Sequence, residues 1–141
     1  MEHSLYDNVS VVVDVASIIL NNDTEGTGAG VDLAGYETAI AIVNVGISAD
    51  TLSGSVYHSV SLQDSADGIT YADVAAAFVE GSSQPTVIDA AAEDPAVLTW
   101  GYKGSKRYIR TFNDTTGTHT TGTPYGAVVV KGRPRHIGTA A

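Results

Sequence analysis

The sequence predicts an all-β protein, a single antiparallel β-sandwich of the jelly-roll-like or immunoglobulin-like kind. Three observations lead to this prediction. Gly, Thr, Ser, Val and Ala dominate the chain, whereas Lys, Glu, Leu and Met, which favour surface helices, are few. Short apolar segments are separated by turn residues at intervals of about eight to twelve residues, as in sandwiches and barrels. No strand-like segment is followed by a full helical pattern, which argues against an α/β fold.

The expected strands are short and alternate between apolar and polar positions. Thr38 to Val45 is an exception, because TAIAIVNV is apolar on both faces, which is typical of a central strand in a layered fold. About seven to nine strands are expected from this pattern. Their ranges are 9–15 with a continuation through 18–20, then 38–45, 54–63, 69–79, 96–102, 106–112 and 125–131.

Two hairpins are expected. Residues 58–74 read HSVSLQDSADGITYADV, in which Val60 and Leu62 alternate with polar residues before a turn at Asp67-Gly68. The three alanines at 75–77 weaken its second arm. The second hairpin pairs 96–102 with 106–112 across the turn KGS.

The 141 residues fit one domain, whose core is large enough to be stable without cross-links. Extended arms are expected at about 1–8 and 132–141, which lack the apolar periodicity of a core strand. The absence of cysteine excludes disulfides, a thiol nucleophile and cysteine-ligated zinc. No apolar segment is long enough to span a membrane, and no basic region precedes an apolar run near the N-terminus, so neither a membrane partner nor a signal peptide is expected.

The charges are distributed unevenly along the chain. All seven basic residues lie after residue 102, whereas Asp114 is the only one of the sixteen acidic residues that does. The net charge of −9 makes nucleic acid an unsuitable partner. Two interpretations remain open: the basic strands interleave with acidic ones in the fold, or they form a patch that docks on an acidic neighbour, including a second copy of the chain.

The chain has few candidates for chemistry. A degenerate calcium-loop spacing occurs at Asn21, Asp23, Glu25, Gly26 and Asp32, but a solvated polar loop explains it more simply. The glycine-rich segments at 26–30 and 101–106 lack the pattern and the helix of a phosphate loop and predict turns. No metal or cofactor is therefore expected.

Histidines and aromatic residues give no clear active site. His3 and His136 are near the termini, His119 falls in a loop expected to be flexible, and His58 alternates with core residues. No nucleophile elbow is present, so no catalytic residue is assigned and an enzyme is not expected. Carbohydrate binding would use exposed aromatic residues, for which the candidates are Trp100, Tyr102 and Tyr108, although packing across strands is favoured for them.

Four segments in order carry a family resemblance: TGTGAGVDLAGYETAIAIVNVG, VSLQDSADGITYADV, YKGSKRYIRTF and GAVVVKGRPRH. Together they resemble a family of small virion structural proteins of tailed bacteriophages, encoded near the major capsid gene. The resemblance covers about residues 26–136. Its most specific pieces are LQDSADG-x-x-Y-x-DV, GYKGSKRYIR and KGRPRH.

The resemblance implies a head decoration or cement protein that binds and stabilises the major capsid shell. Such a protein is made in the cytoplasm of the host bacterium and resides on the capsid surface. Alternatives are a head–tail connector or tail component, and, from another class, a carbohydrate-binding β-sandwich module. Local threefold positions on capsids predict a homotrimer.

Three bases are the candidate contacts with the capsid or an adjacent subunit. Lys131, Arg133 and Arg135 alternate in K-G-R-P-R, where Pro134 stiffens an extended run. Alternate residues of an extended segment share a face, so the three side chains are expected to form one basic edge.

Overall fold

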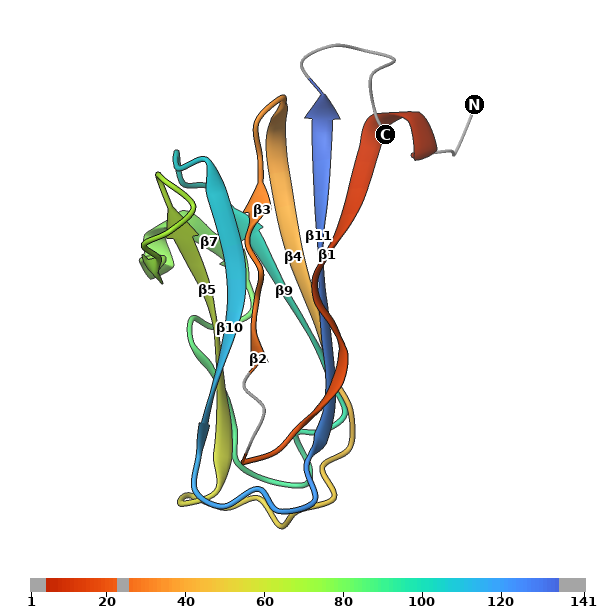
Figure 1. The fold of residues 1–141 in the computed structure, drawn as a ribbon, viewed down its shortest axis with the longest axis vertical. Coiled ribbons are helices and arrows are strands. Elements are labelled where there is room, and N and C mark those ends of the chain that lie inside the picture. Colours follow the sequence, from red (N-terminus) through yellow and green to blue (C-terminus); the bar gives the residue numbers. More distant parts are fainter. Residues whose placement is uncertain (1–4, 23–25, 135–141) are drawn as a thin grey trace.

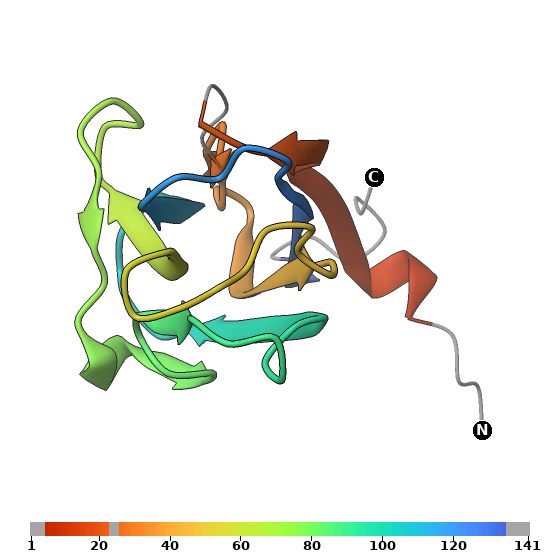
Figure 2. The same cartoon turned by 90° about the horizontal axis from the view of Figure 1, so that it is seen from below.

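The computed structural model describes residues 5–22 and 26–134, which form two packed antiparallel sheets (Figures 1 and 2). The all-β sandwich predicted from composition and periodicity is confirmed. Apart from strands, the described residues contain two short 3₁₀ turns, η1 (Tyr6–Asn8) and η2 (Ala76–Phe78).

The first sheet has five strands in the order β1-β11-β4-β9-β7. Their bounds are β1 Val9–Leu20, β4 Tyr36–Val45, β7 Val79–Gly81, β9 Ala96–Tyr102 and β11 Thr123–Pro134. The long strands β1, β4 and β11 run side by side along the molecule (Figure 1).

The second sheet has six strands and is built around β10 and β5. Short strands pair with the two free edges of this central pair: β2 and β3 with β10, β6 and β8 with β5. The bounds are β2 Gly26–Thr27, β3 Val31–Asp32, β5 Tyr57–Ser65, β6 Ala72–Asp73, β8 Thr86–Ile88 and β10 Tyr108–Thr116.

A single apolar core lies between the sheets. β4 is central in its sheet, as its sequence predicts, and its buried residues face the core: Ala39, Ala41, Val43 and Val45. Trp100 is the largest fully buried side chain, and its indole nitrogen donates a hydrogen bond to the Ser83 carbonyl at 3.1 Å. A buried indole N–H needs such a partner, because leaving it unpaired would cost its full desolvation free energy.

Asp14 is a buried carboxylate that ties the edge strand of one sheet to the other sheet. Its Oδ2 accepts hydrogen bonds from the backbone nitrogen of Thr111 at 2.7 Å and from the Thr111 hydroxyl at 2.8 Å. Its Oδ1 accepts from the backbone nitrogen of Gly30 at 3.1 Å. The register of β1 shifts between Val13 and Val15, so that Asp14 and Val15 are both buried. This irregularity turns a polar side chain inward at a sheet edge.

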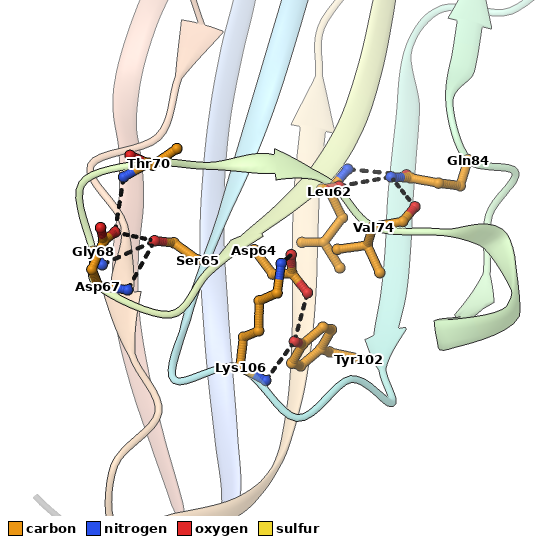
Figure 3. Close-up of polar contacts among 10 residues, drawn as sticks. All are labelled: Leu62, Asp64, Ser65, Asp67, Gly68, Thr70, Val74, Gln84, Tyr102 and Lys106. Atoms are coloured by element: carbon orange, nitrogen blue, oxygen red, sulfur yellow. Dashed lines mark hydrogen bonds and ion pairs between the residues drawn. The ribbon is translucent and has the colours of Figure 1, made fainter.

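The opening hairpin forms its predicted turn, but its second arm is much shorter than predicted. Only Ala72 and Asp73 pair with β5. The chain then crosses to the first sheet as β7. Beyond β6, the side chain of Gln84 takes the place of a strand neighbour, because it accepts from the Leu62 nitrogen at 3.0 Å and donates to the Leu62 carbonyl at 2.7 Å (Figure 3).

The predicted second hairpin is wrong. β9 pairs with β4 and β7, whereas β10 pairs with β5, β2 and β3, so the two strands belong to different sheets. The connection at 103–107 is therefore a crossover between layers. Both strands bury core residues, Trp100 on β9 and Ile109 on β10. Because the two strands lie in facing sheets, these side chains enter the core from opposite sides; in a hairpin both would project from the same sheet.

The arms differ from their predicted bounds. Gly132 pairs with Val9 and Thr38, and Pro134 pairs with Tyr36, so residues 132–134 are strand. At the N-terminal side, residues 6–8 form η1. The rest of the two predicted arms, residues 1–4 and 135–141, lies outside the described residues.

Candidate docking end of the sandwich

The described parts of the three most specific pieces of the sequence resemblance contribute to one end of the sandwich. The β5 turn is there, because Ser65 pairs with Tyr108 at the start of β10. Ala39 lies between Lys131 and Tyr102 on neighbouring strands, so the 103–107 crossover and the end of β11 belong to the same end. This is the upper end in Figure 1. We call residues 32–37, 64–70, 102–108 and 131–134 the motif end.

The turn at the motif end is held by its own side chains (Figure 3). Asp67 Oδ1 accepts hydrogen bonds from the backbone nitrogens of Ile69 and Thr70 at 2.8 and 2.9 Å, and from the Ser65 hydroxyl at 2.8 Å. These donors, the Thr70 nitrogen first, lower the pKa of Asp67 to about 2 from its ordinary 3.8. Gly68 follows with a φ of 75°, which favours glycine. The turn therefore has one defined shape.

A second set of contacts joins β5 to the crossover (Figure 3). The buried carboxylate of Asp64 accepts a hydrogen bond from the Tyr102 hydroxyl at 2.8 Å and forms an ion pair with the Lys106 ammonium at 3.0 Å. The Tyr102 hydroxyl also accepts from the backbone nitrogen of Lys106 at 3.1 Å. Burial, followed by the bond to Asp64, raises the pKa of Tyr102 to about 12.

Asp32 and Arg107 form a bidentate ion pair. The Arg107 Nε and Nη2 atoms donate to the two carboxylate oxygens of Asp32, each at 2.8 Å. The hydrogen bond from Arg107 is the main reason that the pKa of Asp32 is lowered to about 2. The pKa of Arg107 is raised for the same reason. This paired geometry fixes the guanidinium beside β3.

Two of the three predicted docking bases lie in the described residues, and their side chains have different partners. Lys131 is half-buried, with its ammonium 4.7 Å from the centre of the Tyr36 ring and donating to the Asp32 carbonyl at 3.3 Å. Arg133 is exposed and lies 3.5 Å from a Glu37 carboxylate oxygen. Its φ of 52° interrupts the extended conformation on which the alternation depended. Arg135 lies outside the described residues.

Every basic side chain that the structure describes has a partner within its own chain. Lys103 pairs with Glu80, and Arg110 donates to Gln63 and lies over the Tyr71 ring. With the contacts of Lys106, Arg107, Lys131 and Arg133 given above, every described Lys and Arg residue has a partner. The arrangement agrees with the first interpretation of the charge pattern, in which late basic strands interleave with earlier acidic ones.

A shallow hollow opens between the crossover and the start of β4. It has a volume of about 520 Å³ and is lined by polar side chains that include Glu37, Lys106 and Arg107 and by the rings of Tyr36 and Tyr102. Both charge signs are therefore present on its rim. Such a surface suits a partner that carries both acidic and basic groups, because each charge on the rim can then lie opposite a charge of the other sign on the partner.

The opposite end of the sandwich carries acidic side chains and none of the described Lys or Arg residues. We call it the acidic end, defined by Asp50, Asp89, Glu93, Asp94 and Asp114. The Asp50 carboxylate accepts hydrogen bonds from the backbone nitrogens of Thr121 and Gly122 at 2.9 and 2.7 Å, and the bond from Thr121 is the main cause that lowers its pKa.

The calcium-loop interpretation is wrong for the residues that the structure describes. Leu20, just before Asn21, pairs with Thr123 near the acidic end. Asp32 pairs with Tyr108 at the motif end and binds Arg107. The first and last proposed ligands thus lie towards opposite ends of the molecule, and Asp23 and Glu25 fall outside the described residues.

Sequence reasoning missed a histidine pair near the acidic end. His119 is fully buried, contrary to the flexible loop predicted for it, and its ring centroid is 4.6 Å from that of buried His58. The Nε2 atom of His58 lies 2.9 Å from the Thr123 hydroxyl. The Nε2 atom of His119 lies 2.9 Å from the Thr116 carbonyl oxygen. The only available signal was the alternation of His58 with core residues, because the contact joins positions far apart in sequence.

The aromatic candidates for carbohydrate binding do not share an exposed face. Trp100 is in the core, and Tyr102 is bound to Asp64 and Lys106. Tyr108 lies at the motif end, with the Arg107 guanidinium 5.3 Å from its ring centre. In residues 5–22 and 26–134, no three His, Asp or Glu side chains group as a metal site, and no helix is long and apolar enough to cross a membrane.

Comparison with known proteins finds neither a matching family model nor a matching curated protein. The resemblance to phage virion proteins therefore rests on the sequence segments themselves.

Proposed function

We propose that this protein is a structural component of a tailed-phage virion that decorates and stabilises the major capsid shell. The observation that carries the proposal is the resemblance of four ordered segments to such proteins. The positions of these segments support it. The pieces LQDSADG, GYKGSKRYIR and the described part of KGRPRH, distant in sequence, all contribute to the motif end.

A repeated contact on a shell needs a surface whose shape is set before binding. The motif end has this property, because Asp67 fixes the turn and Asp64 and Asp32 fix the crossover. We propose that this end faces the capsid and that Arg133 and Arg135 contribute to the contact. Lys131 contributes by holding Tyr36 and Asp32 in place.

In this role the chain is synthesised in the host cytoplasm and becomes part of the capsid surface. The homotrimer expected from the sequence rests on capsid symmetry and on no residue of this chain, so it stays a prediction. A connector or tail component would use the same fold with far fewer copies.

Particles assembled without this chain provide the test. We expect complete shells that open at a lower temperature than wild-type shells and that regain wild-type stability when the purified protein is added. A protein that neither binds these shells nor changes the temperature at which they open would contradict the decoration role.

A further inference from the structure

The outer face of the five-stranded sheet is apolar across three neighbouring strands. Two rows of side chains cross β1, β11 and β4 in register. The rows are Val11, Val130 and Ile40, and Val13, Val128 and Ile42. We call these six residues the outer face. Val11 and Val13 are 61% and 60% exposed, and the other four are partly exposed. Neither row contains a charged side chain.

This face is hollowed towards the acidic end. A groove of about 790 Å³ opens there and is lined mainly by apolar side chains, among them Val13, Ile18, Ile42, Pro124 and Val128. Gly46 and Gly126 are among its lining residues, and neither adds a side chain to it. At the other end of the same strands, η1 projects beside the start of β1, on the side of the outer face (Figure 2), and Leu5 directly precedes it in the chain. Leu5 and Tyr6 are 69% and 85% exposed.

We propose that the outer face binds a second copy of this chain, related by a two-fold axis that makes the strands of the two copies run in opposite directions. Apolar patches that continue over several strands mark interaction sites in proteins. In an antiparallel pair, the Leu5–Tyr6 projection of each copy faces the half of its partner that carries the groove. The contact is then the same surface on both copies, as a two-fold interface requires.

Charge selects this direction. All the described Lys and Arg residues come from 103–110 and 131–133, towards the motif end, whereas the acidic end carries carboxylates and no described base. An antiparallel pair places the acidic end of one copy beside the base-bearing end of the other. A parallel arrangement would bring two acidic ends together, at a cost in free energy. The inference concerns the free chain and does not depend on the virion role. Because the two motif ends of an antiparallel pair point in opposite directions, docking of the motif end on a shell, like the trimer expected from capsid symmetry, would require the pair to separate.

Native mass spectrometry and analytical ultracentrifugation over a concentration series test the pair. We expect the wild-type chain to be a monomer–dimer equilibrium. Val13→Asp places a short carboxylate in the interface and should weaken dimerisation by roughly ten-fold or more. Val87→Asp is the matched control, because Val87 is also an exposed strand valine but lies on β8 in the other sheet. It should leave the dimer intact.

The absence of natural cysteines allows a test of direction that needs no disruption of the face. Asp7→Cys on η1 and Ser17→Cys beside the groove should form a mixed disulfide when the two variants are oxidised together. Same-site disulfides in excess of the mixed one would show parallel copies and overturn the proposal. A wild-type chain that stays monomeric or forms trimers, or a Val13→Asp chain that dimerises as well as Val87→Asp, would overturn it too.

Discussion

Asp14 shows how one side chain can hold two layers together. It lies on an edge strand, yet it is buried and accepts hydrogen bonds from Thr111 on the other sheet and from Gly30 in a loop. An inward-pointing carboxylate on an edge strand also discourages further strand pairing at that position.

Asp14→Ala should lower the free energy of unfolding by about 3 kcal/mol, because the buried backbone nitrogen of Thr111 and the partly buried one of Gly30 lose their acceptor, and each such loss costs about 1–3 kcal/mol. Urea denaturation measures this difference. Asp114→Ala, at an exposed position of β10 in the other sheet, is the control and should stay within about 0.5 kcal/mol of the wild type. Equal stability of the two variants would show that Asp14 does not join the sheets.

His58 should make stability depend on pH. Burial, followed by the nearby His119, lowers the pKa of His58 below its ordinary 6.5, against smaller opposing effects of Asn113, Asp50 and Asp94. As pH falls through about 6.5, the unfolded chain therefore takes up a proton that the folded chain does not, and unfolding becomes more favourable until the folded-state pKa is reached.

Unfolding measured between pH 8 and pH 5 checks this dependence. The wild type should lose stability over the acidic part of the range. His58→Gln, which is polar and does not titrate, should show a flatter profile whatever its absolute stability. Identical slopes for the two proteins would assign the pH dependence to other groups.

At the scale of elements, Gln84 replaces a missing length of strand. It lies between the parts of β5 that pair with β6 and β8, and its amide also donates to the Val74 carbonyl at 3.2 Å. Its side chain therefore satisfies backbone groups on a strand edge that has no strand neighbour there.

Gln84→Ala should lower the free energy of unfolding by about 1–3 kcal/mol, because the Leu62 backbone nitrogen loses its acceptor, whereas the Leu62 carbonyl keeps the hydrogen bond from the Val74 nitrogen. Gln63→Ala is a close control, since the Gln63 side chain bonds only to the Asp73 and Arg110 side chains and should change stability by about 0.5 kcal/mol. Thermal unfolding of both variants compares them, and a larger effect at Gln63 would refute the role given to Gln84.

Local pattern predicted the elements better than their pairing. The apolar run at 38–45 indicated a central strand, and the Asp67-Gly68 turn was predicted by the positive φ that hairpin turns need. The crossover at 103–107 has the length of a hairpin loop, and nothing in its sequence tells a turn within one sheet from a passage between two. The same limit applies to the His58–His119 contact and to Lys131, because their partners are set by packing across the sandwich.

At the scale of the whole molecule, the fold largely removes the charge asymmetry of the sequence near the motif end. Bases from the last third of the chain pair there with acids from the first two-thirds, as Arg107 does with Asp32. The acidic end has no such compensation among the described residues. The molecule is therefore polar along its long axis, with the mixed-charge end suited to a charged partner.

Arg133→Gln should separate docking from folding. The side chains of Arg133 and of its ion-pair partner Glu37 are 74% and 51% exposed, so loss of the pair should change the free energy of unfolding by only about 0–1 kcal/mol. Binding to shells that lack the protein should become weaker and less dependent on salt. Glu80→Gln breaks a similarly exposed ion pair, that with Lys103, from β7, which is outside the motif end, and it should leave shell binding at the wild-type level. If Glu80→Gln weakens binding as much as Arg133→Gln, the effect does not report a contact at residue 133.

The copy number of the protein in purified virions tests the decoration role most directly. Under the proposed role, quantitative mass spectrometry of the purified phage particles gives the ratio of this chain to the major capsid protein. A decoration protein is predicted to be present in hundreds of copies, in fixed proportion to the shell subunits. A ratio corresponding to about a dozen copies or fewer, or absence from the particles, would contradict the account.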